Sequence, residues 1–276
     1  MAERALTVSL AALSQTGRRE CNEDAFGYWE GAGCVVAVLC DGAGGHGGGQ
    51  AASRAAVTHV LEAFAVHPEF SLEALQSLLH GANDAVAAQQ VAGTLTADMR
   101  TTIVVLLLDL YRGAALWAHA GDSRLYHWHD DRLIGRTRDQ SLEQRLLDAG
   151  LNAAAVTSGE LTSALGSPEG FEIEILETPQ ILASGEALLL CSDGLWSAFD
   201  DVAMERSVVG CNGVQAWLGR LEAGVQQADR SDQDNYSALA VWCGAARISS
   251  SSSRSSGSGG QAAVRGRKSC SAASAE

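Results

Sequence analysis

The chain has 276 residues, of which 46% are hydrophobic and 19% charged, so it can fold around a substantial apolar core. Its net charge of −14 argues against nucleic acid or an anionic membrane surface as a partner, because phosphate groups are bound by basic surfaces. Apolar runs such as residues 103–108 are far too short to cross a bilayer, so no membrane span is expected.

Hydrophobic patterns place the predicted strands and helices in separate groups along the chain. Apolar residues at helical spacing predict two consecutive helices, over residues 50–66 and 72–88. Strands are predicted over residues 5–13, 34–40, 101–110, 114–119, 125–128, 132–134, 171–176, 187–191 and 237–242. Because the strands group around hairpin signals and the helices form their own block, an α+β fold is favoured over a regular βαβ winding.

The composition changes sharply near residue 248, where a run rich in serine and glycine begins. Such a segment buries too little apolar surface to offset the entropy lost on ordering. The sequence therefore predicts one folded domain over residues 1–247 and a disordered tail over residues 248–276.

The seven cysteines form neither a CxxC pair nor a cluster with zinc-ligand spacing. Most of them lie in apolar runs, where a free cysteine packs as a small hydrophobic side chain. This pattern indicates neither disulfides nor zinc, and it favours the reducing cytoplasm. Abundant alanine and an excess of arginine over lysine favour a bacterial source with a GC-rich genome.

Several apolar runs are bordered by an aspartate beside glycine or another small or polar residue, namely Asp24, Asp41, Asp122, Asp193 and Asp234. A single aspartate of this kind is usually a turn or helix-cap residue. Carboxylates about 4 Å apart repel by roughly 4 kcal/mol per pair at an effective dielectric of about 20, so a cation must offset several of them. Oxygen ligands without histidine or cysteine select Mg²⁺ or Mn²⁺, and no segment has the loop pattern of a calcium site. The sequence therefore predicts a catalytic metal site where several strands meet.

The glycine-rich segment 42–49 follows Asp41 directly. Glycine there lets a metal or a substrate approach the backbone closely, although a plain flexible loop is the alternative interpretation. The segment matches neither of the phosphate-cradling glycine patterns, so nucleotide binding is rejected.

Seven short segments resemble, in their order and rough spacing, the motifs of the metal-dependent protein phosphatases of the PPM type, also called protein phosphatase 2C, in their short bacterial form. These segments are residues 22–25, 41–46, 100–102, 120–124, 161–166, 190–195 and 234–237. The resemblance covers about residues 7–243. It implies a four-layer α/β/β/α sandwich with the metal centre in the cleft where the two sheets meet.

The resemblance also implies which residues bind the metals. Asp41 is expected to bridge two ions, and Asp193 and Asp234 to complete the first. The Gly42 carbonyl and Asp24 are expected to serve the second, with Glu23 acting directly or through water. Asp122 is expected to hold a third, weaker ion together with Asp193.

Arg19 matches the arginine that grips the substrate phosphate, and residues 141–160 match the variable flap over the cleft. Gly17 stands one residue closer to Arg19 than is usual, which leaves Arg18 as an alternative anchor. Ala43 occupies the place where some members carry a histidine thought to protonate the leaving group, so the general acid is open. His46 is expected to order its loop.

Asn235, next to Asp234, is expected to support the site without binding the metals. The predicted function is hydrolysis of phosphoserine and phosphothreonine in proteins by water activated between two Mn²⁺ or Mg²⁺ ions. Phosphorylated proteins, including a Ser/Thr kinase or its targets, are the expected partners, and the enzyme is expected to oppose such a kinase. The alternatives are a phosphoprotein-binding relative without activity and a phosphatase for other phosphate esters. No feature of the sequence predicts an oligomeric state.

Overall fold

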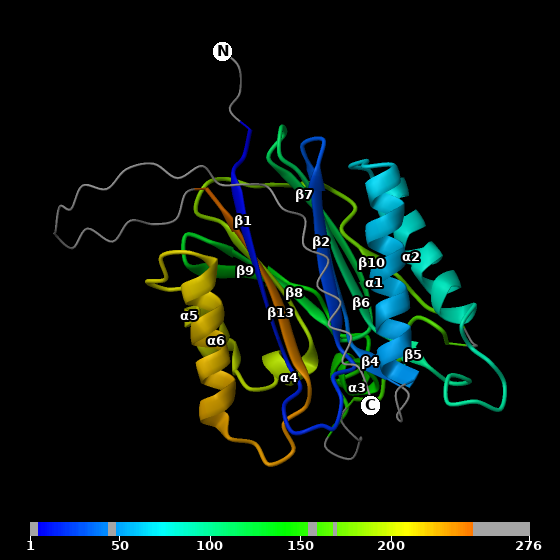
Figure 1. Ribbon diagram of the computed structural model, residues 1–276. Coiled ribbons are helices and arrows are strands. Elements are labelled where there is room, and N and C mark those ends of the chain that lie inside the picture. Colours follow the sequence, from blue (N-terminus) through cyan, green and yellow to red (C-terminus); the bar gives the residue numbers. More distant parts are fainter. Residues whose placement is uncertain (1–4, 44–47, 154–158, 168–169, 245–276) are drawn as a thin grey trace, which may run out of the picture.

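The computed structural model describes residues 5–43, 48–153, 159–167 and 170–244. Two antiparallel sheets pack face to face, and helices cover the outer face of each (Figure 1). Sheet A has the strand order β1 (Val8–Gln15), β13 (Tyr236–Cys243), β12 (Ala187–Cys191), β8 (Arg124–His129) and β9 (Arg132–Arg136). Sheet B has the order β10 (Glu174–Ile175), β7 (Ala114–Ala120), β6 (Ile103–Asp109), β3 (Cys34–Cys40) and β2 (Ala25–Gly31), and β11 (Gln180–Ile181) also pairs with β7.

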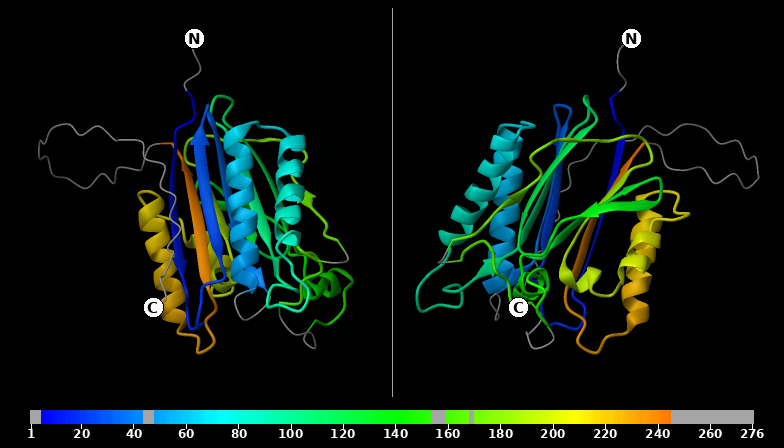
Figure 2. Two further views of the ribbon diagram at one scale, coloured as in Figure 1. Left: turned by 45° about the vertical axis from the view of Figure 1, so that its right-hand side comes forward. Right: turned by 180° about the vertical axis from the view of Figure 1, so that it is seen from behind.

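The helices form the two outer layers (Figure 2). The helices α1 (Gly48–Val66) and α2 (Leu72–Ala87) pack on sheet B, and α5 (Asp201–Arg206) and α6 (Val214–Ala228) pack on sheet A. Two short helices, α3 (Leu142–Asp148) and α4 (Asp193–Trp196), and the small ribbon of β4 (Gly42–Ala43) and β5 (Arg100–Thr101) lie at one end of the sandwich. The α+β fold with four layers, α/β/β/α, is therefore confirmed.

The alternation of side chains along each strand divides the core into three layers. In β3, Val36 and Val38 face the helices of sheet B, whereas Val35 and Leu39 face sheet A. Strands of this kind have both faces covered, which explains why they read as continuous apolar runs rather than alternating ones. The third layer lies between sheet A and α6, where Trp217 is fully buried.

Some predicted elements differ from the structure. The predicted strand 101–110 is interrupted at Thr102, because Thr101 pairs with Gly42 in the small ribbon and β6 begins only at Ile103. Of the predicted strand 171–176, only Glu174–Ile175 forms a strand, and the Leu176 amide donates to the Trp117 carbonyl at 2.9 Å. The sequence patterns did not predict β2 or α6.

The described cysteines are all free. No helix within the described ranges is long and apolar enough to cross a bilayer. The predicted tail, residues 248–276, lies outside the described residues.

Candidate metal centre

The strand registers bring the five predicted aspartates to the same end of the sandwich. In sheet B, Ala25 pairs with Cys40, so Asp24 and Asp41 lie beside one another just beyond the two strand ends. In sheet A, Cys191 pairs with both Arg124 and Ala238, so the segments that carry Asp122, Asp193 and Asp234 reach this same end. In Figure 1 it is the lower end, where α4, β4 and β5 are labelled.

Two threonines hold the backbone of Asp41. The Asp41 amide donates to Thr102 Oγ1 at 2.9 Å, and the Asp41 carbonyl accepts from Thr101 Oγ1 at 2.8 Å. Thr102 Oγ1 also lies 2.7 Å from Ser123 Oγ, in the turn that links sheet B to sheet A. The interruption of the predicted strand at Thr102 thus fixes Asp41 against the second sheet.

Gly42 has no room for a side chain. A Cβ atom there would collide with the carbonyl oxygens of Gly49 and Glu23. Glycine at this position lets the first turn of α1 pack directly on the segment after Asp41.

Asn235 fixes the loop that carries Glu23 and Asp24. Its Oδ1 accepts from the Glu23 amide at 2.8 Å, and its Nδ2 donates to the carbonyls of Thr16 and Cys21 at 2.8 and 2.9 Å. The structure therefore places Asn235 behind the carboxylates, bonded to main chain on three sides.

Two buried carboxylate oxygens lack partners. Ser192 Oγ donates to Asp24 Oδ2 at 2.8 Å, but Asp24 Oδ1 and Glu23 Oε1 have no hydrogen-bond partner among the described residues. Buried polar atoms are nearly always bonded, so orphaned oxygens at a carboxylate cluster fit a site for a hard cation.

Burial dominates the electrostatics of this cluster. It raises the pKa of Asp24 and of Asp122 to about 7 each, with the charge of Asp193 adding to the effect in both cases. The pKa of Asp41 is raised well above its usual value by burial and by its carboxylate neighbours, and burial also raises the pKa of Asp193. The anionic forms that a cation requires are thus destabilised until a cation is present.

The described carboxylates lie close to one another, but they do not surround a shared ion position. Within the described ranges, no three carboxylate, imidazole or thiol ligands are arranged around one ion position. Asp41 and Asp193 lie close enough for each to shift the pKa of the other. The donor set nevertheless fits Mg²⁺ or Mn²⁺, because it consists of oxygen ligands whose mutual repulsion a divalent ion would remove.

Arg19 and Arg18 point to different places. Arg19 Nη2 donates to Asp234 Oδ2 at 2.6 Å, which puts this guanidinium at the edge of the carboxylate cluster. Arg18 donates to Asp229 Oδ1 at 3.1 Å and to the Arg230 carbonyl at 3.2 Å, at the end of α6. Among the described residues, Arg19 is the candidate anchor that contacts a predicted site residue.

Sequence reasoning missed three side chains that hold the predicted residues in place: Ser192 on Asp24, Gln140 on Gly121 and Trp196 on Asp122. Ser192 and Gly121 belong to the recognised motifs, but the contacts span 168, 19 and 74 residues, so no local pattern shows them. His46 and residues 154–158 of the predicted flap lie outside the described residues. The described part of the flap segment, residues 141–160, contains α3.

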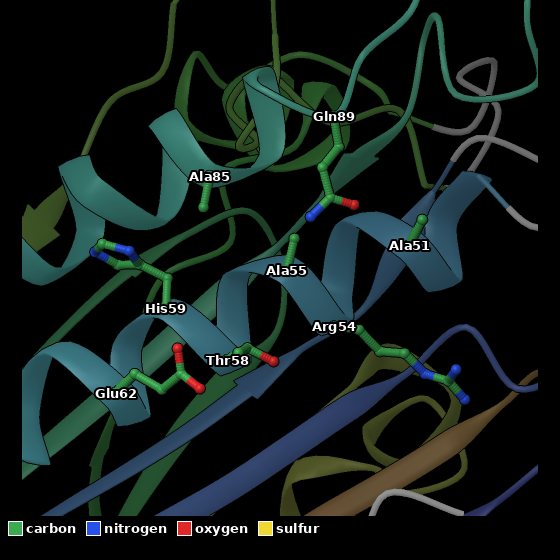
Figure 3. A pocket seen from close by; sticks show the side chains of 8 residues that line it. All are labelled: Ala51, Arg54, Ala55, Thr58, His59, Glu62, Ala85 and Gln89. Atoms are coloured by element: carbon green, nitrogen blue, oxygen red, sulfur yellow. The ribbon is translucent and has the colours of Figure 1, made fainter. Parts of the chain in front are cut away.

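A groove of about 460 Å³ lies away from this cluster, between α1 and α2 (Figure 3). Small and polar residues line it, together with Arg54, His59 and Glu62. In Figure 3 the Arg54 side chain points away from His59 and Glu62. None of the predicted site residues that the structure describes lines this groove, so it does not alter the assignment of the site.

Comparison with known proteins gives a consistent picture. A family model described as protein phosphatase 2C matches residues 14–229. The serine/threonine protein phosphatase PstP of Mycobacterium tuberculosis is 31% identical over 204 residues, which cover 73% of this chain and 39% of the relative. The chain therefore spans less than half the length of this relative.

Two further matches cover most of their counterparts. The protein phosphatase PhpP of Streptococcus pneumoniae is 29% identical over 211 residues, covering 68% of this chain and 79% of the relative. A crystal structure of the catalytic domain of PstP with two manganese ions is 27% identical, with a TM-score of 0.72 over 86% of this chain and 99% of that one.

Proposed function

Because this chain belongs to the protein phosphatase 2C family, we propose that it hydrolyses phosphoserine and phosphothreonine in proteins with the help of two divalent cations. The observation that carries the proposal is the convergence of buried and partly buried aspartates from both sheets at one end of the sandwich. Glu23 Oε1 and Asp24 Oδ1 support it, because these buried oxygens have no hydrogen-bond partner among the described residues.

The residues have distinct proposed roles at the cations. Asp41, Asp193, Asp234, Asp24 and the Gly42 carbonyl would hold two ions, and a third would lie near Asp122. Mn²⁺ or Mg²⁺, when bound, supplies a Lewis acid that lowers the pKa of water and neutralises charge on the phosphoryl oxygens. The two manganese ions in the PstP structure support this assignment.

Arg19 would bind the phosphate of the substrate. A guanidinium can donate two parallel hydrogen bonds to two phosphate oxygens, and lysine cannot reproduce this geometry. The contact of Arg19 with Asp234 places it beside the cluster, whereas Arg18 is engaged by Asp229. Arg19 would therefore orient the phosphoryl group for attack.

The leaving serine or threonine oxygen also needs a proton. Ala43 carries no titratable group, so this chain does not offer an imidazole there. We assign the proton to water at the site.

Phosphorylated proteins are the proposed substrates, and opposition to a Ser/Thr kinase in the bacterial cytoplasm is the proposed setting. A phosphoprotein-binding relative without activity is the second candidate, and a phosphatase for other phosphate esters is the third. Retention of all the predicted carboxylates favours catalysis over binding alone.

Turnover of matched substrates tests these candidates. We expect Mn²⁺-dependent hydrolysis of phosphothreonine peptides, little hydrolysis of phosphotyrosine peptides or sugar phosphates, and none with chelator or in Asp193→Asn. Preference for a sugar phosphate would favour the third candidate. Tight phosphopeptide binding without hydrolysis in Mn²⁺ would favour the second.

A further inference from the structure

Four consecutive residues, 137–140, bind the turn between β7 and β8 that carries Asp122. We call this segment the strap. Thr137 bonds to Leu125 twice, through its amide at 2.9 Å and through Oγ1 at 3.0 Å. The Arg138 carbonyl lies 2.7 Å from His119 Nε2. The strap therefore bonds to a residue before the turn, His119, and to a residue after it, Leu125.

Gln140 forms the contacts nearest to Asp122. Its amide donates to the Gly121 carbonyl at 2.9 Å, and its side-chain Oε1 accepts from the Gly121 amide at 2.9 Å. Both backbone polar groups of Gly121 are thus bonded to one residue. Gly121 has φ +106°, and a Cβ there would press on Thr102, so the turn is also fixed from its other side.

Trp196 holds the residue that follows. Its indole Nε1 donates to the Asp122 carbonyl at 3.0 Å. The Arg124 guanidinium lies 3.4 Å from the centre of the Trp196 ring, and Asp139 of the strap accepts two bonds from Arg124, at 2.7 and 2.6 Å. The ring orientation is therefore set by an arginine that the strap itself fixes.

We propose that Gln140 and Trp196 are positioning residues for Asp122. Gln140 fixes the peptide before Asp122 and Trp196 fixes the peptide after it, so the main chain that carries the carboxylate is held from two sides. Both side chains act on main-chain groups beside Asp122, and neither is assigned a direct contact with substrate or a cation. The inference rests on the proposed function only in requiring that Asp122 binds a divalent cation.

Loss of either bond would leave the turn free to adopt other conformations. The Gly121 amide would also lose its acceptor in Gln140→Leu. A hydrogen bond of this kind changes an equilibrium by about five- to tenfold. We therefore expect the cation site at Asp122 to weaken by that factor, and the sites at Asp41 to be unaffected.

Direct Mn²⁺ binding, counted from the electron paramagnetic resonance signal of free Mn²⁺, tests the proposal on the full chain. The relevant step is the binding step that Asp122→Asn removes. Gln140→Leu and Trp196→Phe should each raise the dissociation constant of this step about five- to tenfold and leave the tighter steps unchanged. Gln140→Glu keeps an acceptor for the Gly121 amide and should restore binding.

Two matched controls remove similar bonds elsewhere. Gln144→Leu removes a bond from Gln144 Nε2 to Asp148 in α3, and Trp128→Phe removes a bond from Trp128 Nε1 to the Glu205 carbonyl. Both should bind Mn²⁺ like the unmodified chain. A thermal melt of each variant comes first, and Trp196→Phe carries the test if Gln140→Leu does not fold.

The proposal is overturned if Asp122→Asn removes no binding step, if Trp196→Phe binds Mn²⁺ as the unmodified chain does, or if Gln144→Leu weakens the step equally. Failure of the proposed function is a separate result. It would show as absent phosphopeptide turnover in a chain whose Mn²⁺ binding follows the expected pattern.

Discussion

The two ends of the sandwich treat buried carboxylates in opposite ways. At the end away from the cluster, Glu186 is buried, and each of its oxygens has a histidine partner. His127 Nε2 lies 2.6 Å from Oε2 and His129 Nδ1 lies 3.0 Å from Oε1. At the cluster end, Asp24 Oδ1 and Glu23 Oε1 are buried with no such partner among the described residues.

This difference shows that burial alone does not mark a functional carboxylate. Glu186 is fully bonded within the chain, so it needs nothing further and reads as a structural residue. The aspartates at the cluster end instead raise one another's pKa through burial and repulsion. Among the described residues, Arg19 pairs with Asp234, but Asp24 Oδ1 and Glu23 Oε1 have no hydrogen-bond partner, and such uncompensated carboxylate oxygens fit a site for an external cation.

Neutralising the cluster should have the largest effect. Asp41→Asn or Asp193→Asn should lower phosphopeptide turnover in Mn²⁺ by at least about a thousandfold, because Lewis-acid stabilisation is worth several kcal/mol. In the presence of a chelator, the Tm of each variant should be no lower than that of the unmodified chain, because the substitution removes a repelling carboxylate. Kinetics and thermal melts measure both effects, and full turnover in either variant would remove the metal assignment.

Removing the nearby guanidinium should have the next largest effect. Arg19→Ala should raise KM roughly tenfold or more and lower kcat less, because ground-state binding of phosphate is lost. Arg18→Ala is the matched control, since Arg18 is engaged by Asp229. If KM rose in the control and not in Arg19→Ala, the anchoring role would pass to Arg18.

The pH dependence of stability in chelator should reveal the raised pKa values at the cluster end. The folded-state pKa of Asp24 and of Asp122 is about 7, above the ordinary value of 3.8, so the folded state binds more protons than the unfolded state between these values. Stability should therefore fall as pH rises from about 4 to about 7, with Tm lower at pH 8 than at pH 5.5 by about 5 °C or more.

Mn²⁺ should suppress this slope at neutral pH and raise Tm by binding linkage. Asp122→Asn should reduce the slope in chelator. A chelated protein that became more stable from pH 5.5 to 8 would contradict the raised pKa values.

The smallest effect on turnover is expected at the opposite end. Glu186→Gln should lower the free energy of unfolding by about 1–3 kcal/mol, because it disrupts a buried bonded pair with His127. Turnover at saturating Mn²⁺ should stay within about twofold, since Glu186 lies at the other end of β12 from Asp193. Denaturant melts measure the free energy of unfolding, and kinetics on the same samples measure turnover. A loss of turnover would contradict the structural role assigned to Glu186.

Much of the fold follows from the sequence where strands are buried on both faces. Residues 34–40 and 187–191 were predicted with their observed bounds, because uniformly apolar strands leave little ambiguity. The edge strand β2 escaped prediction because it carries Gly27 and Gly31 and an exposed Tyr28. Gly27 is explained only in space, where a side chain would collide with Leu61 of α1.

The site residues, too, fall into those that local sequence predicts and those that only the structure shows. Aspartates that border apolar runs could be found from local sequence, since antiparallel pairing brings such ends together. Ser192, Gln140 and Trp196 could not, because each acts on a residue distant along the chain. The resemblance to a family supplied roles for the aspartates and left out the side chains that orient them.

The register of the β2–β3 hairpin sets the relative position of two site carboxylates. Asp24 stands just before its first strand and Asp41 just after its second, and seven residue pairs from Ala25 with Cys40 to Gly31 with Cys34 join the two. A single-residue deletion in either strand would slide one carboxylate past the other and invert the faces of every residue beyond it. Insertions or deletions should therefore be tolerated at the hairpin tip, near Ala32 and Gly33. Within β2 or β3 they should disrupt the site.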